Sequence, residues 1–164
     1  MQLNRRDRQQ PEVVAFGEFI RTLTDEIQEA EHMPPGGVTI QIPDDLLIVF
    51  DRGHLNQIMW NLVRNAWQHC QKREGSIRIV ARAGYMGDAV ICELNDDGPG
   101  IPAELRPQIF EPFFTTRPGG TGLGLYIARE LADANGAALE LLPKGPGAHF
   151  RMTLKRALTP ERTK

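Results

Sequence analysis

Residues 119–124, "GGTGLG", place four glycines in six positions directly before a helical pattern. Each glycine costs about 0.5–1 kcal/mol relative to alanine in a regular element, so this cluster needs a physical reason. The first turn of a helix has unpaired N–H groups and a partial positive charge, and residues without a Cβ let a phosphate approach them. A flexible loop that ends at a helix start would have a similar composition. The segment alone therefore leaves a nucleotide site and a plain loop as alternatives.

A second group of polar residues lies on the helix predicted for residues 52–69. Asn61 and Asn65 are four residues apart and so share one face, at the edge of an apolar stripe. Asparagine forms helices poorly, but its side-chain oxygen is a usable neutral ligand for a cation. The alternative is a pair of solvated asparagines.

A third pattern, Asp96-x-Gly98-x-Gly100, follows the strand predicted for residues 89–96. A carboxylate at a strand end can accept a hydrogen bond from the exocyclic amine of adenine, and it would repel the carbonyl oxygen of guanine. A simple tight turn would use the same residue types. These residues therefore predict either adenine recognition or a turn.

The elements that must position these residues follow from hydrophobic periodicity. Apolar residues at three- and four-residue steps predict helices over 16–30, 52–69 and 123–135, with Asp51 capping the second and Gly136 ending the third. Strands are predicted at 38–42, 46–50, 76–83, 89–96, 137–142 and 149–156, with the first two forming a hairpin around 43–45, and a short helical segment near 104–109. About five strands in a mostly antiparallel, mixed sheet with three helices on one face make an α/β two-layer sandwich.

Composition narrows the function classes. The chain has 164 residues, 41% hydrophobic content and a net charge of −2, which fits one soluble domain without an electrostatic footprint for nucleic acid. The basic cluster Arg5, Arg6 and Arg8 is interpreted as a solvated end. Cys70 and Cys92 lack a second pair, which disfavours a disulfide framework or a zinc site and predicts reduced, buried thiols. No P-loop motif is present.

Taken in order, the motifs resemble a known family. Asn61–Asn65, Asp96-x-Gly98-x-Gly100, "FEPFF" at 110–114 and "GTGLGL" at 120–125 are similar to the N, G1, F and G2 boxes of sensor histidine kinase catalytic domains. These domains belong to the GHKL superfamily, with the Bergerat fold, that also includes gyrase, Hsp90 and MutL. The resemblance covers about residues 38–154. The segments "FEPFFTT" and "GTGLGLYIARELADANGA" resemble the NtrB and PilS branch, and PilS-like kinases most of all.

The resemblance implies ATP and Mg²⁺ as ligands and assigns roles to residues. Asn65, with Asn61, would bind the metal, Asp96 would recognise adenine, and residues from about 102 to 119 would form a mobile lid. Phe110, Phe113 and Phe114 would anchor this lid, although ordinary packing would explain them equally. The remaining nucleotide-binding residues implied are Gln68, His69, Gly98, Gly100, Ile101, Thr116, Gly120, Thr121, Gly122, Leu123, Gly124 and Leu125.

One departure from the family pattern concerns charge. Related kinases often carry Lys or Arg three residues after the second Asn and Tyr or His at the next position; here these are Gln68 and His69. Arg106 or Arg117 would then supply the cation, unless both are only solvated surface residues. Hydrolase relatives have a glutamate that activates water where this chain has Asn61, an amide that takes no proton. This disfavours an ATP hydrolase, and complete boxes disfavour a nucleotide-sensing module without phosphotransfer.

The resemblance also implies a domain organisation and a set of partners. Residues 1–14 are expected to be the tail of a preceding dimerisation and phosphoacceptor helix or a linker, 15–157 the catalytic domain, and 158–164 a flexible tail. The expected partners are a phosphoacceptor hairpin of the same kinase and a response regulator of the NtrC-like type, with no nucleic acid and no membrane contact. We expect a monomeric fragment of a homodimeric sensor that is membrane-bound, with this domain in the cytoplasm. His32, His54 and His149 are expected to be structural.

Overall fold

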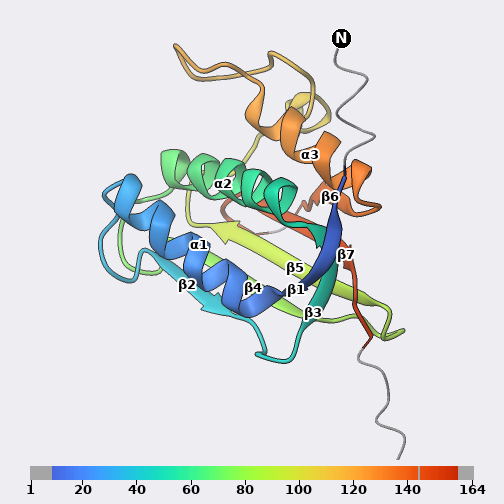
Figure 1. Cartoon of the computed structure of the whole chain (residues 1–164). Helices are drawn as coiled ribbons and strands as arrows, with labels where there is room; N and C mark the ends of the chain where they lie inside the picture. Colours follow the sequence, from blue (N-terminus) through green and yellow to red (C-terminus); the bar gives the residue numbers. More distant parts are fainter. Residues whose placement is uncertain (1–8, 144, 159–164) are drawn as a thin grey trace, which may run out of the picture.

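The computed structural model describes residues 9–143 and 145–158, which form two layers (Figure 1). Three helices, α1 (Phe16–Ala30), α2 (Arg52–His69) and α3 (Gly124–Ala134), cover one face of a five-stranded sheet. This is the two-layer α/β sandwich that the sequence predicts. The Arg5, Arg6 and Arg8 cluster, the first eight residues of the expected tail and residues 159–164 lie outside the described residues.

The main sheet is mixed, as predicted. Its strands run in the order β2 (Val38–Gln41), β4 (Ile77–Ala83), β5 (Ala89–Asp96), β7 (His149–Lys155) and β6 (Ala138–Leu141). β2 pairs with β4 in parallel, and the other neighbours pair antiparallel. β5 is central, so the residues that follow it emerge from the middle of the sheet.

The hairpin predicted for residues 38–42 and 46–50 is wrong. β2 joins the edge of the main sheet, whereas β3 (Leu47–Asp51) pairs antiparallel with β1 (Pro11–Ala15) in a separate two-stranded sheet. The residues between β2 and β3 do not indicate which strands distant in sequence will pair with each of them. In the fold, β2 pairs with β4 and β3 pairs with β1. Residues 11–14, which we assigned to a preceding tail, therefore form a strand of this fold.

The core lies between the helices and the sheet. Alternate residues of β5 and β7 are buried, which is the period of a sheet with one covered face. α2 buries seven residues along its length, and α1 contributes Phe16, Ile20 and Ile27. Cys92 is buried in this core, and burial raises the pKa of its thiol to about 12, so the thiol stays protonated.

Polar contacts fix the two helices that border the site. The Asp51 carboxylate accepts a hydrogen bond from the backbone N–H of His54 and so caps α2, as predicted. The side chain of Asn135, at the end of α3, bonds to the Asp51 N–H and to the His54 ring. The beginning of α2 is thus held against the end of α3. Within the described ranges, no helix is long and apolar enough to cross a bilayer.

Candidate functional site

A cavity of about 530 Å³ lies between α2, the end of β5, the segment 101–122 and the beginning of α3. That segment projects from the body of the molecule at the top of Figure 1. The cavity brings together predicted residues from all four sequence motifs. Those lining it are Asn61, Asn65, Gln68, His69, Asp96, Gly100, Ile101, Phe114, Thr116, Arg117, Gly120, Thr121, Gly122, Gly124 and Leu125.

α2 forms one wall of the cavity. Asn61, near Gly124 of α3, and His69, beside the residues that follow β5, are separated by about 12 Å along a helix at 1.5 Å per residue. Asn65 lies between them, and its backbone oxygen contacts His69 Nδ1 at 2.8 Å. The Asn61 Nδ2 atom is buried and has no hydrogen-bond partner among the described residues. The Asn61 side chain therefore lies at the α3 end of the cavity, and Asn65 lies one helical turn closer to His69.

The Asp96 carboxylate closes the other end of the cavity. Asp96 is only 2% exposed. Its Oδ1 accepts hydrogen bonds from the backbone N–H groups of Gly98 (2.9 Å) and Ala148 (3.3 Å). Its Oδ2 is buried without a hydrogen-bond partner in the described structure. Burial raises the pKa of Asp96 despite the two backbone N–H bonds, because the ionised form is incompletely compensated.

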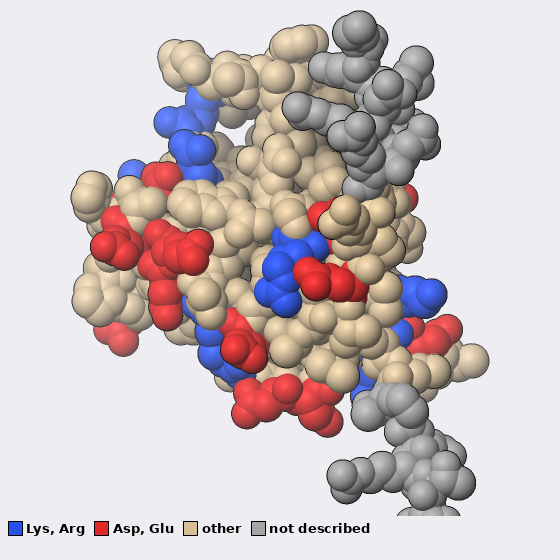
Figure 2. Space-filling model, in the orientation of Figure 1, with Lys and Arg blue, Asp and Glu red and all other residues tan. Residues whose placement is uncertain are grey.

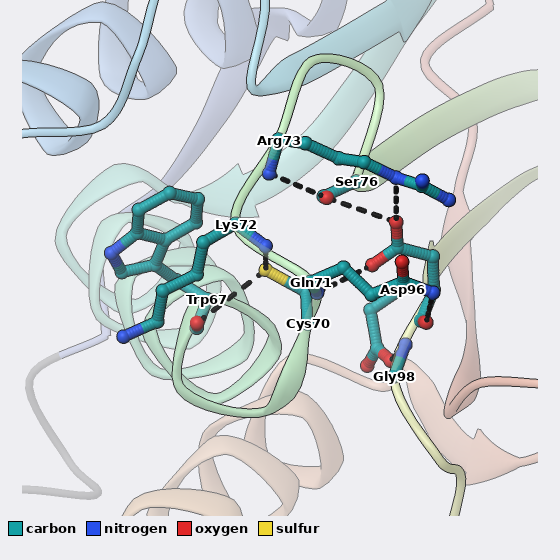
Figure 3. A network of polar contacts seen from close by, with 9 residues as sticks. Trp67, Cys70, Gln71, Lys72, Arg73, Ser76, Asp96 and Gly98 are labelled. Carbon is teal, nitrogen blue, oxygen red and sulfur yellow. Dashed lines mark hydrogen bonds and ion pairs between the residues drawn. The ribbon is translucent and has the colours of Figure 1, made fainter.

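The neighbouring Asp97 holds this end of the cavity in place. In Figure 3, Gln71, Arg73 and Ser76 of the loop after α2 lie beside Asp96 at the end of β5. The Asp97 carboxylate accepts hydrogen bonds from the Gln71 N–H (2.8 Å) and the Ser76 hydroxyl (2.9 Å). Arg73 Nε is 3.4 Å from the same carboxylate. Burial alone would raise the pKa of Asp97, but these hydrogen bonds outweigh it and lower the pKa. The ionised Asp97 therefore stabilises the loop beside Asp96.

Close backbone packing explains two glycines near Asp96. A Cβ on Gly98 would lie 2.3 Å from the His69 carbonyl oxygen, and one on Gly147 would lie 1.7 Å from the Asp96 carbonyl oxygen. Gly98 is outside the cavity lining, and its missing Cβ lets the strand end pack against α2. Its predicted role of letting a base approach stays a prediction. Gly147 was not predicted, because "GPG" before a strand is indistinguishable from an ordinary turn.

The glycine-rich segment has a similar steric explanation. Gly122 has a φ of +69°, and a Cβ there would lie 2.4 Å from the backbone of Phe113. The Phe113 N–H donates to the Gly122 carbonyl at 2.9 Å. This contact closes the 101–122 segment onto the start of α3, where no side chain caps the helix and where Gly124 and Leu125 line the cavity. The first N–H groups of α3 therefore belong to residues that line the cavity.

The three phenylalanines of the segment differ from one another. Phe110 packs edge-on against Phe150, with ring centroids 6.1 Å apart, and lies under the Arg129 guanidinium at 4.8 Å. Phe114 lines the cavity and packs against the core. Phe113 is 75% exposed, so the prediction that its side chain anchors the segment is wrong. Its φ of +66° serves the backbone contact with Gly122 instead.

Of the two arginines predicted as the phosphate-binding cation, only one lines the main cavity. Arg117 lines the cavity, but Arg106 lies beside a second, smaller cavity, where its Nε donates to the Ile101 carbonyl at 3.1 Å. Sequence analysis missed Arg64, which lines the main cavity one residue before Asn65. Its position three residues after Asn61, on the same helix face, was a usable signal. Phe110 and Leu123, also predicted as site residues, lie outside the cavity lining.

The site's composition fits a nucleotide better than a metal ion alone. The described residues contain no group of three or more His, Cys, Asp or Glu side chains that could hold a metal. They do offer a buried carboxylate oxygen without a partner at one end, and amide side chains with helix N–H groups at the other. A ligand with a hydrogen-bond donor at one end and anionic oxygens at the other fits this arrangement.

Comparison with known proteins shows the family of the chain. Residues 50–158 match the family described as histidine kinase-, DNA gyrase B-, and HSP90-like ATPase. The chain belongs to this ATPase family. The fold is that of a histidine kinase catalytic domain within it, and such a domain uses a nucleotide.

Several relatives are sensor kinases. The chain is 33% identical to the sensor protein kinase PilS of Pseudomonas aeruginosa over 162 residues, which cover 93% of this chain and 29% of PilS. It is 35% identical to the nitrogen regulation protein NtrY of Azorhizobium caulinodans, over 70% of this chain and 16% of NtrY. The chain thus spans less than a third of the length of these two relatives.

Solved structures give the same result for the fold. The nucleotide-free catalytic domain of the histidine kinase ThkA superposes with a TM-score of 0.75 at 29% identity, covering 90% of this chain and 96% of that one. Full-length ShkA in complex with AMPPNP gives a TM-score of 0.76 at 28% identity, covering 93% of this chain and 32% of that one.

Proposed function

We propose that this domain binds Mg-ATP in the cavity, with adenine at Asp96 and the phosphates between α2 and the start of α3. The observation that carries the proposal is the Oδ2 atom of Asp96, which is buried and has no hydrogen-bond partner among the described residues. An adenine amine would donate to this oxygen and offset the cost of its burial. At the other end, the first N–H groups of α3 and the Gly120–Gly124 backbone would bind phosphate oxygens. The nucleotide complex of ShkA, a structural relative, supports the same ligand class.

Mg²⁺ would be held mainly by the nucleotide. Asn65, with Asn61, would supply neutral oxygens, the ligand type that Mg²⁺ prefers. Neutral ligands alone bind a divalent cation weakly, so the metal would enter together with the phosphates. When bound, it would neutralise the charge that develops on the transferred phosphoryl group.

The proposed reaction is transfer of the γ-phosphoryl group to a histidine on a separate helical hairpin. The bond from γ-phosphorus to the β,γ-bridging oxygen breaks, an N–P bond forms, ADP leaves and the imidazole proton passes to solvent. Asn65 and the α3 N-terminus would position the phosphates for in-line attack.

Three of the four histidines of this chain are poor acceptors. His54 bonds to Asn135, and His149 lies 3.3 Å from Glu93 on the main sheet. His69 lies on the cavity wall itself, on the helix that would bind the metal, where in-line attack is geometrically implausible. We therefore expect this chain to bind ATP without labelling itself.

Hydrolysis is the weaker alternative. Among the described residues lining the cavity, Asp96 is the one carboxylate. It lies beside the His69 end of α2, roughly two helical turns from Asn61. No carboxylate lining the phosphate end is therefore placed to activate water, and Asn61 takes no proton.

The wider setting follows the sensor kinase relatives. We propose a two-component system in which the acceptor hairpin dimerises the full-length kinase and a response regulator of the NtrC-like type receives the phosphoryl group. We further propose that the kinase is a membrane-bound sensor whose catalytic domain is cytoplasmic, and that the described domain alone is monomeric. The similarity to PilS and to NtrB of Klebsiella oxytoca supports this assignment.

Phosphotransfer can be tested with γ-labelled ATP and Mg²⁺. The chain alone should stay unlabelled, and adding the acceptor hairpin of the same kinase as a separate protein should produce acid-labile label on the hairpin. Replacing the acceptor histidine of the hairpin with alanine is the control and should abolish labelling. Stoichiometric, acid-labile label on the chain alone would contradict the proposal.

A further inference from the structure

Arg64 pairs with an acidic residue and also borders the main cavity. Its Nε lies 3.0 Å from Glu31 Oε1, and its side chain also lines the main cavity. The ion pair with Glu31 involves Nε, and the two Nη groups of a guanidinium carry four further N–H donors. The side chain can therefore stay paired with Glu31 and still have donors for a second partner.

The position of Arg64 relative to the asparagines matters. Asn61, Arg64, Asn65 and Gln68 follow at three- and four-residue steps, so the four side chains share one face of α2. Gln68 occupies the position where related kinases often carry a cation. Arg64 lies one turn earlier, between the two asparagines proposed to face Mg²⁺ and phosphate. A planar guanidinium there can bind phosphate oxygens through two donors.

The pair with Glu31 is weak enough to exchange. The Arg64 side chain is 52% exposed and that of Glu31 is 28% exposed, and solvent-exposed ion pairs contribute little to stability. Glu31 forms the C-cap of α1, where the helix dipole disfavours a negative charge and no basic residue lies in the last turn. Figure 2 shows acidic side chains gathered over this part of the molecule, next to basic side chains below the projecting segment. A charge-assisted contact with a polyphosphate is stronger than such a surface pair.

We propose that Arg64 is the phosphate-binding cation of this site and that nucleotide binding exchanges its partner from Glu31 to a phosphate group. This inference rests on the proposed function. Arg64 supplies from within the helix the charge that Gln68 lacks, and Glu31 holds the side chain at the cavity edge until the nucleotide arrives. Arg117, on the projecting segment, is then a second cation that approaches from the opposite wall.

The test is calorimetric titration of three variants with AMP-PNP plus Mg²⁺ and, separately, with adenosine. Arg64→Gln should weaken AMP-PNP binding by about ten- to a hundredfold and change adenosine binding by less than about twofold. Glu31→Gln should strengthen AMP-PNP binding, because it removes the competing partner. Arg21→Gln is the matched control: Arg21 pairs with Asp44 at 2.7 Å on the surface, away from the cavity lining, and its loss should change neither affinity.

Three results would overturn the inference. Unchanged AMP-PNP binding by Arg64→Gln would show that Arg64 makes no phosphate contact, and an equal loss of both ligands would show a structural role. Weaker AMP-PNP binding by Glu31→Gln would contradict partner exchange. Failure of the parent chain to bind AMP-PNP would instead refute the proposed function, so the two failures are distinguishable.

Discussion

Asp96→Asn separates recognition of adenine from stability of the fold. The backbone N–H groups of Gly98 and Ala148 bond to one carboxylate oxygen, so the amide oxygen of the variant is expected to stay there. The amide nitrogen, a donor, then replaces the partnerless Oδ2 and faces the adenine amine, which is also a donor. Losing a charge-assisted hydrogen bond costs about 1–3 kcal/mol, which is about a five- to 150-fold weaker Kd for ATP.

Stability should respond in the opposite direction. Burial raises the pKa of Asp96 in the folded state above its unfolded value, so the ionised form that dominates at neutral pH is disfavoured by folding. A neutral asparagine avoids this cost, and the Tm of the variant should equal or exceed that of the parent. The same amide can donate to the guanine carbonyl, so the preference for ATP over GTP should narrow.

The assay is calorimetric titration of parent and variant with an ATP analogue and a GTP analogue, together with thermal melts. Asp44→Asn makes the same chemical change at an exposed site and should leave both nucleotide affinities unchanged. Equal ATP affinity in Asp96→Asn and the parent would show that Asp96 is only a turn residue. A lowered Tm of Asp96→Asn would mean that its weaker binding results from loss of structure, which would refute the reasoning.

Three further predictions follow from the same site. Asn65→Ala should abolish the Mg²⁺ dependence of nucleotide binding with a normal melting curve; an unchanged metal dependence by calorimetry would reject the assignment. The pKa of Asp97 is lowered in the folded state. Its contribution to the free energy of unfolding is therefore present above the ordinary pKa of 3.8 and is lost as the pH falls through the folded pKa. Asp97→Asn should therefore flatten the acid decline of stability in urea titrations, and an identical slope would contradict this. Gly147→Ala should destabilise the fold by at least about 1–3 kcal/mol through its clash with Asp96, and should weaken ATP binding. The control Gly53→Ala should be tolerated, because the nearest contact of the added Cβ is 3.4 Å. Equal Tm values for the two variants would contradict the clash.

Local patterns in the sequence predicted most of the helices and strands. The apolar stripe of α2, its Asp51 cap and the Gly136 terminator of α3 are determined by residues within one or two turns, so periodicity was sufficient. Partners of strands are not local. β2 and β3 lie close in sequence but join different sheets, and only the assembled fold pairs β3 with β1.

The site shows the same division between local and distant information. Motif spacing located Asp96 and the asparagines, because residues on one helix face or at one strand end are predictable from sequence. It did not show that Gly98 and Gly147 are required by backbone packing, since their neighbours, His69 and Asp96, approach only in three dimensions. Arg64 was not predicted because the family pattern places the cation of this helix at position 68.

The most direct test of the account is equilibrium titration of this chain with a non-hydrolysable ATP analogue, with and without Mg²⁺, alongside the matching GTP analogue. The account predicts saturable, one-to-one binding of the adenine nucleotide that Mg²⁺ strengthens, and much weaker binding of the guanine nucleotide. Absence of saturable binding, or equal affinity for the two nucleotides, would contradict the central claim that the cavity beside Asp96 is an adenine nucleotide site.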